Sequence, residues 1–195
     1  MLATAGPVPE SRGWAFEVKF HGVRAIAYSS PDGLRLFSRN DRDITSSYPD
    51  VTATDTDAAG LGEGLVLDGE LVTLDERGRP DFGLLQHRMH LAHPAAELLG
   101  QTPVQYIVFD VLRHNGDSLL AVPYRERREV LAGLGLDARG ALRVPANFVD
   151  TPGSVVMDAV AAQGLEGVVA KQLDSVYVPG KRVRSWIKTA IRHIL

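Results

Sequence analysis

One lysine stands where a short apolar segment meets a glycine, in the stretch Lys19-Phe20-His21-Gly22-Val23-Arg24. A lysine amine attacks an electrophile only in its unprotonated form, which burial or nearby cations favour. The chain supplies two such cations, Lys171 and Lys188. Lys19 is therefore a candidate nucleophile that leaves the edge of a strand and points into a cleft. The alternative is an ordinary solvated lysine at a strand end.

Charged residues inside apolar, strand-like segments accompany this lysine. A buried strand tolerates a charge only when something pairs with it or coordinates it. The segments are Leu34–Asn40 with Arg39, Leu65–Val72 with Asp68 and Glu70, Tyr106–Leu112 with Asp110, Glu166–Lys171, and Ser185–Lys188. Three acids and three lysines on such segments predict one shared polar site.

The elements that must position these residues are short strands and a few helices. The predicted strands lie near residues 14–19, 23–29, 33–38, 65–74, 104–112, 166–171 and 184–189, and the predicted helices near 48–59, 81–92, 123–134 and 153–163. Hairpin-like pairs of strands stand next to helices, and strands and helices do not alternate strictly. This order favours an α+β fold with antiparallel sheets.

Composition limits the classes of protein. A chain of 195 residues with 45% hydrophobic and 23% charged residues can bury one sizeable core. It has no cysteine, which excludes disulfides and zinc–thiolate sites, and no apolar run or leader that indicates a membrane or secreted protein. The net charge of −3 is unusual for a free-standing nucleic-acid binder, but residues 175–195 contain no acid and six basic or histidine residues.

Three histidines, His87, His90 and His93, have a spacing that invites a metal interpretation. Zinc without cysteine needs four well-placed ligands, or an open site with a carboxylate, and neither is evident. We therefore predict that they are surface or loop residues.

The motifs together resemble those of the ATP-dependent DNA ligases, within the nucleotidyltransferase superfamily that also holds RNA ligases and mRNA capping enzymes. The likeness is greatest to bacterial end-joining and stand-alone ligases. The nucleophile motif of the family is Lys-x-Asp-Gly followed two residues later by Arg, and Lys19, Gly22 and Arg24 match it. Later motifs match in order at Ser38-Arg39, Asp68-Gly69-Glu70, Phe109-Asp110, Glu166-Gly167 with Lys171, and Trp186 with Lys188.

The resemblance implies an adenylation domain over residues 1–188, with two antiparallel β-sheets flanked by helices and a nucleotide cleft between the sheets. Residues 189–195 would begin a linker to an OB-fold domain that this chain lacks. The implied substrate is nicked or broken duplex DNA in repair, handled by a monomeric, cytoplasmic and nucleoid-associated enzyme.

The resemblance also implies a role for each matching residue. Lys19 would attack the α-phosphate of ATP, release pyrophosphate and carry AMP through a P–N bond. The other implied nucleotide contacts are Glu17 and Val18 at the adenine edge, Phe109 stacked on adenine, Arg24 and Glu70 at the ribose, and Arg39, Glu166, Lys171 and Lys188 around the phosphates. Glu70 and Glu166 would lie near Mg²⁺ or Mn²⁺, and Arg39 and Arg182 near the 5′-phosphate of the nick.

The chemistry of the transfer gives an independent reason for these residue types. In phosphoryl-type transfer the nucleophile, the phosphorus and the leaving group lie roughly in line, and catalysis is mostly positioning and charge neutralisation. Mg²⁺ prefers oxygen ligands and keeps several waters, so one or two carboxylates suffice.

Two positions depart from the family pattern. His21 stands where the motif has Asp, and Ala190 stands where many relatives have a second lysine. An imidazole is a poor partner for Mg²⁺, so His21 bears mainly on the later, DNA-dependent steps. Two alternatives stay open at this point: a catalytically silent nucleotide- or DNA-binding module, and an RNA ligase or capping-type nucleotidyltransferase.

Overall fold

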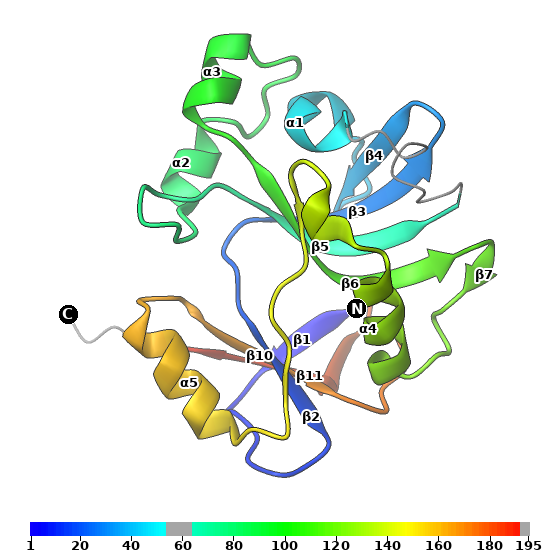
Figure 1. Ribbon diagram of the computed structural model, residues 1–195, viewed down its shortest axis with the longest axis vertical. Helices are drawn as coiled ribbons and strands as arrows, with labels where there is room; N and C mark the ends of the chain where they lie inside the picture. Colours follow the sequence, from blue (N-terminus) through cyan, green and yellow to red (C-terminus); the bar gives the residue numbers. More distant parts are fainter. Residues whose placement is uncertain (54–63, 192–195) are drawn as a thin grey trace. The chain divides into compact units, whose positions relative to one another are not determined.

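The computed structural model describes residues 1–53 and 64–191 of the chain (Figure 1). These residues form two compact units. Of these, the first unit comprises residues 1–20, 120–126 and 145–191, and the second comprises residues 21–53, 64–119 and 127–144.

A five-stranded sheet forms the centre of the first unit. In the order β1-β11-β10-β2-β9, its strands are β1 (Leu2–Ala5), β11 (Arg182–Ala190), β10 (Gly167–Gln172), β2 (Trp14–Val18) and β9 (Phe148–Val149). All neighbours are antiparallel except β1 and β11. Helix α5 (Gly153–Ala162) packs on one face, where Val156 and Val160 meet Phe16, Val168 and Ala170 (Figure 1). The opposite face carries the buried ion pair of Lys171 and Glu17.

A six-stranded sheet forms the centre of the second unit. In order, its strands are β4 (Gly33–Ser38), β3 (Val23–Ser30), β5 (Val66–Val72), β6 (Gln105–His114) and β7 (Asp117–Ser118), with β8 (Leu142–Arg143) paired to β6 in parallel. The short helices are η1 (Thr45–Ser47), α1 (Pro49–Thr52), α2 (Phe82–Gln86), α3 (Ala96–Gln101) and η2 (Leu136–Ala138). Helix α4 (Tyr124–Gly133) begins in the first unit and continues into the second.

Gly69 lets a buried tyrosine pack inside the second sheet. The Tyr106 hydroxyl donates hydrogen bonds to the carbonyls of Ala25 and Leu67, and its ring lies over Gly69. A Cβ atom at Gly69 would come within 2.5 Å of the Ile107 carbonyl oxygen and 2.6 Å of the Tyr106 ring. The glycine of the Asp-Gly-Glu segment is therefore required by packing.

We expect Gly69→Ala to lower the free energy of unfolding by about 1–3 kcal/mol, because the added methyl forces apart a closely packed core. Gly100→Ala is the control, since a Cβ there meets nothing within 4 Å. Urea unfolding followed by circular dichroism measures both. Equal stabilities of the two variants would contradict the packing role of Gly69.

The α+β class with mostly antiparallel sheets is confirmed, and each predicted strand is present within about two residues of its expected ends. Strands β1, β7, β8 and β9 and helix α3 were not predicted. Of the predicted helix 48–59, α1 covers Pro49–Thr52, and positions 54–59 lie outside the described residues.

The predicted helix 81–92 is wrong in its length, because α2 ends at Gln86. Asp81 caps its first turn by accepting a hydrogen bond from the Leu84 amide. Beyond α2 the Arg88 side chain turns inward and is fully buried against Asp50, at 3.0 Å. His90 then takes a left-handed φ of 65°, which a helix cannot contain. Across residues 1–53 and 64–191, no helix has both the length and the apolar character to cross a membrane.

Candidate functional site

Lys19 directly follows β2 in the first unit and is fixed by its backbone. Its amide donates to the Gly167 carbonyl oxygen at 2.8 Å, and its Nζ forms an ion pair with Glu166. The Lys19 side chain is 20% exposed. The structure thus gives the predicted nucleophile an anchored, partly exposed position at a strand end, with a carboxylate as its ion-pair partner.

Glu166 has one oxygen left over for another ligand. Its Oε1 contacts Lys19, while its Oε2 is buried and makes no hydrogen bond to any described residue. A buried carboxylate oxygen without a donor is costly unless a cation or water satisfies it. This oxygen fits the predicted role of Glu166 beside a divalent cation. Within 1–53 and 64–191, however, no group of three or more His, Cys, Asp or Glu residues could hold a metal ion by itself.

Strand register places the predicted nucleotide residues Glu17, Lys171 and Lys188 of the first unit on one face of its sheet. Glu17 and Lys188 are both register partners of Val169, and Lys171 pairs with Trp186. Directly opposed residues in antiparallel strands point to the same side. Glu17, Lys171, Trp186 and Lys188 therefore share the face opposite α5. Val18 belongs to the α5 side instead and packs with the apolar core there.

Lys171 and Glu17 form a buried ion pair on that face. The two charged groups lie 2.7 Å apart, and their side chains are 1% and 3% exposed. The Tyr124 hydroxyl donates a hydrogen bond to the second oxygen of Glu17. The Lys171 ammonium lies 4.9 Å from the Tyr124 ring centroid and 4.4 Å from that of Trp186. Lys188, by contrast, is exposed.

In the second unit, Arg24 lies between a buried acid and the predicted adenine-stacking aromatic. Its Nε donates to Asp68 at 2.9 Å, its Nη2 pairs with the other oxygen of the same carboxylate, and its guanidinium lies 5.3 Å from the Phe109 ring centroid. Glu70 is the register partner of Arg24 on β5. The predicted ribose residues and the predicted stacking residue are thus neighbours.

Phe109 sits at an irregularity in the sheet. Opposite β5, Asp68 pairs with Asp110 and Gly69 pairs with Val108, so Phe109 is the extra residue of a bulge. A bulge turns a side chain out of the regular alternation, often next to a functional site. Phe109 is partly exposed although its neighbours on β6 are buried, as a ring that stacks on a ligand must be.

Asp110, one of the three acids of the predicted polar site, has a buried structural partner. Its carboxylate pairs with Arg127 of α4 at 2.8 Å, and both side chains are buried. The acid opposite it, Asp68, pairs with Arg24. Each of the two facing carboxylates thus has an arginine as an ion-pair partner.

His21 and Gly22 fix the chain just after Lys19. The His21 ring stacks in parallel on Phe82, with centroids 4.4 Å apart and planes 3° from parallel. A Cβ at Gly22 would come within 2.0 Å of the Leu71 carbonyl oxygen, so no other residue fits there. The imidazole thus has a packing partner that a carboxylate would not exploit.

The remaining assigned residues are exposed basic side chains. Arg39 follows β4, and Arg182 on β11 donates to the Ala3 carbonyl. Lys181 and Arg184 are exposed on the same strand or next to it, while Arg192 and His193 lie outside the described residues. His87, His90 and His93 are exposed, which confirms the prediction of surface histidines.

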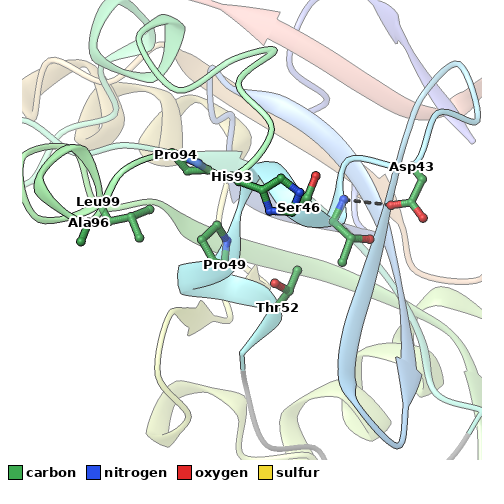
Figure 2. A pocket seen from close by; sticks show the side chains of 9 residues that line it. Asp43, Ser46, Pro49, Thr52, His93, Pro94, Ala96 and Leu99 are labelled. Atoms are coloured by element: carbon green, nitrogen blue, oxygen red, sulfur yellow. Dashed lines mark hydrogen bonds between the residues drawn. The ribbon is translucent and has the colours of Figure 1, made fainter.

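The second unit also carries an open hollow of about 630 Å³ (Figure 2). It is lined by Asp43, Thr45, Ser46, Pro49, Thr52, His93, Pro94, Ala96 and Leu99. Hydrogen bonds from Thr45 and Arg35 lower the pKa of Asp43 to about 2, so this carboxylate is charged at neutral pH. The lining includes no residue that the sequence assigned to nucleotide, metal or DNA.

Sequence reasoning missed Tyr124, Arg127 and Phe82. The only signal for the first two was their place in the first turn of a helix after Pro123, where Tyr and Arg are three residues apart. Their partners Glu17 and Asp110 are distant in the sequence, so only the fold identifies the pairs.

Comparisons with known proteins agree with this geometry. The family model for the ATP-dependent DNA ligase domain matches residues 8–189. The multifunctional non-homologous end joining protein LigD of Mycolicibacterium smegmatis is 41% identical over 98% of this chain, which spans 23% of that protein. DNA ligase C1 of the same organism is 38% identical over 93% of the chain, which spans 53% of that ligase.

Solved structures give the same result. The ligase domain of Mycobacterium tuberculosis LigD has a TM-score of 0.81 and 36% identity, with 96% of this chain and 58% of that chain covered. A mycobacterial DNA ligase D complexed with ATP also has a TM-score of 0.81, at 35% identity, with 97% and 58% covered. The chain therefore belongs to the ATP-dependent DNA ligase domain family.

Proposed function

We propose that this chain is an adenylation domain in which Lys19 attacks the α-phosphate of ATP to form lysyl-AMP, for sealing nicks or breaks in duplex DNA. One observation carries the proposal: Lys19 is anchored at the end of β2 and paired with Glu166, in a sheet whose polar face presents Lys171 and Lys188. The chain spans under a quarter of the LigD relative, whose other parts lie outside this sequence.

The Lys19–Glu166 pair has a direct consequence for the reaction. An ammonium group held in an ion pair has no free electron pair with which to attack. Glu166 must therefore release Lys19 before the amine attacks. The Oε2 atom of Glu166 makes no hydrogen bond to a described residue, so the same carboxylate can also bind a divalent cation. Mg²⁺ or Mn²⁺ held there, with Glu70 as a second proposed ligand, would neutralise the charge of the leaving pyrophosphate.

The other roles follow from side-chain chemistry. We assign the α-phosphate to Lys171 and Lys188, the adenine face to Phe109 and the ribose to Arg24 and Glu70. Recognition of the adenine edge falls to Glu17 or to the backbone at Val18, because the Val18 side chain packs in the core. Exposed Arg39 and Arg182 suit phosphate contacts, on the nucleotide for Arg39 and on the nick for both.

The alternatives are not favoured, because the matching family and its closely similar relatives are DNA ligases. Incubation with α-labelled ATP and Mg²⁺, then denaturing electrophoresis, tests the proposal. Acid-labile label on the protein is expected, and parallel labelling with GTP distinguishes a capping-type enzyme.

We further propose that the protein is a cytoplasmic, nucleoid-associated monomer. The domain would end at residue 188, with an OB-fold domain after the linker, although β11 itself continues to Ala190.

We expect Phe109→Ala to weaken nucleotide binding by about 1–3 kcal/mol, the usual worth of a base stacked on an aromatic ring. Phe148→Ala is the matched control, since Phe148 is 40% exposed on β9 and has no proposed role. Isothermal calorimetry with ATP and AMP measures both. Unchanged affinity in a folded Phe109→Ala variant would make this ring ordinary packing.

We expect His21→Asp to raise nick sealing far more than ATP affinity in a version of the protein extended by its OB-fold domain. The motif carboxylate acts at the reacting centre, and an interaction felt mainly in the transition state changes turnover rather than binding. His87→Asp adds the same charge at an exposed histidine and serves as the control. If wild type and His21→Asp sealed nicks at equal rates, stacking of His21 on Phe82 would serve as well as the carboxylate.

A further inference from the structure

Side chains of the first unit enclose Lys171. It lies on β10 with 1% of its side chain exposed, between the rings of Tyr124 and Trp186 and next to the Glu17 carboxylate. All four residues belong to the first unit. Aromatic faces attract a cation, and the attraction is stronger where water is excluded. The enclosure therefore holds the ammonium group in one place.

Both oxygens of Glu17 are used inside this enclosure. One accepts from Lys171 at 2.7 Å, and the other accepts from the Tyr124 hydroxyl. A buried carboxylate is tolerated only when paired and hydrogen-bonded. Tyr124 therefore supplies the hydrogen bond to the second oxygen of Glu17, and Glu17 in turn holds Lys171. A carboxylate engaged in this way is poorly suited to reading the edge of a base.

The fold fixes the two rings independently of the ion pair. Tyr124 begins α4, and its amide donates to the Ser175 carbonyl oxygen at 2.9 Å, just beyond β10. Trp186 is the β11 register partner of Lys171, and the Tyr177 ring supports it edge-on at 6.0 Å. The walls thus come from three separate segments around one lysine.

We infer that Glu17 and Tyr124 are positioning residues for Lys171: the Tyr124 hydroxyl holds Glu17, and Glu17 holds the ammonium group. The inference rests on the proposed function, in which Lys171 contacts the α-phosphate. A charge fixed in advance needs no reorganisation when the transition state forms. Selection of adenine then falls to the backbone near Val18 and to Phe109, rather than to the Glu17 side chain.

Single-turnover adenylation with α-labelled ATP tests this chain of contacts. Tyr124→Phe removes only the hydroxyl and keeps the ring over Lys171. We expect it to slow lysyl-AMP formation at saturating ATP by about 10- to 100-fold, as misplacement of a catalytic group does. Glu17→Gln should slow it at least as much, and the preference for ATP over ITP should stay unchanged in both variants. Tyr28→Phe, at an exposed tyrosine of the second unit, is the control.

The double variant decides whether the two residues act in series. Because Tyr124 works through Glu17, Tyr124→Phe should add little to the defect of Glu17→Gln. Additive defects, an unchanged rate, or an altered preference for ATP over ITP would each overturn the inference. If Glu17→Gln does not fold, Tyr124→Phe and its rate still decide the matter.

Failure of the proposed function would look different. A wild-type chain that takes no label contradicts the proposed function, and calorimetric affinity for AMP in the same variants then tests the inference. Weaker AMP binding in each single variant, without further loss in the double variant, supports it. Unchanged or additive affinities overturn it.

Discussion

Lys19→Ala is expected to take no label from α-labelled ATP, whereas the wild-type chain takes acid-labile AMP. The variant lacks the amine at the end of β2, which is the group proposed to lie in line with the α-phosphate. The fold should survive, because Lys19 is partly exposed and a pair of this kind contributes little to stability.

Two further variants make that result specific. Lys181→Ala removes an exposed lysine of the same unit and should label like the wild type. Lys19→Arg keeps a cation beside Glu166 but has no nucleophilic amine, so it should fold and remain unlabelled. Label on Lys19→Ala or on Lys19→Arg would show that another residue is the nucleophile. Circular dichroism confirms that each variant is folded.

The strands that carry the motifs were predictable because their apolar residues are locally organised. Strands β2, β3 and β4 begin at their predicted residues, Trp14, Val23 and Gly33. Strand β1 was missed because it is four residues long and depends on β11, about 180 residues away in the sequence. Helix α2 was predicted too long because the sequence pattern does not reveal that Arg88 is buried against Asp50.

The types of site residue were predictable, but their partners were not. A charged residue in an apolar strand predicts that it has an ion-pair partner, and Glu17, Asp68 and Asp110 each have one. The sequence pattern does not identify the partner residue. One turn of α4 supplies Tyr124 to Glu17 in the first unit and Arg127 to Asp110 in the second. Such assignments depend on tertiary packing that the local sequence does not encode.

Glu166→Gln is expected to slow lysyl-AMP formation by about 100- to 1,000-fold, the usual cost of removing one preorganised electrostatic contact at a reacting centre. Glutamine keeps the shape of the side chain and removes its charge, so both the ion pair with Lys19 and the proposed cation ligand are lost. The loss of the ion pair alone would free the amine and speed the reaction. A large decrease therefore identifies the cation as the dominant partner of Glu166.

Titration with Mg²⁺ separates the two contributions. Without added metal, in the presence of EDTA, the wild type should take no label, and Glu166→Gln should need a higher Mg²⁺ concentration for half of its maximal rate. Glu76→Gln, at an exposed acid in a turn, should match the wild type in rate and in metal requirement. Faster labelling by Glu166→Gln at every Mg²⁺ concentration would show that Glu166 only restrains Lys19, because a residue that ligates the catalytic cation cannot be removed with a gain in rate.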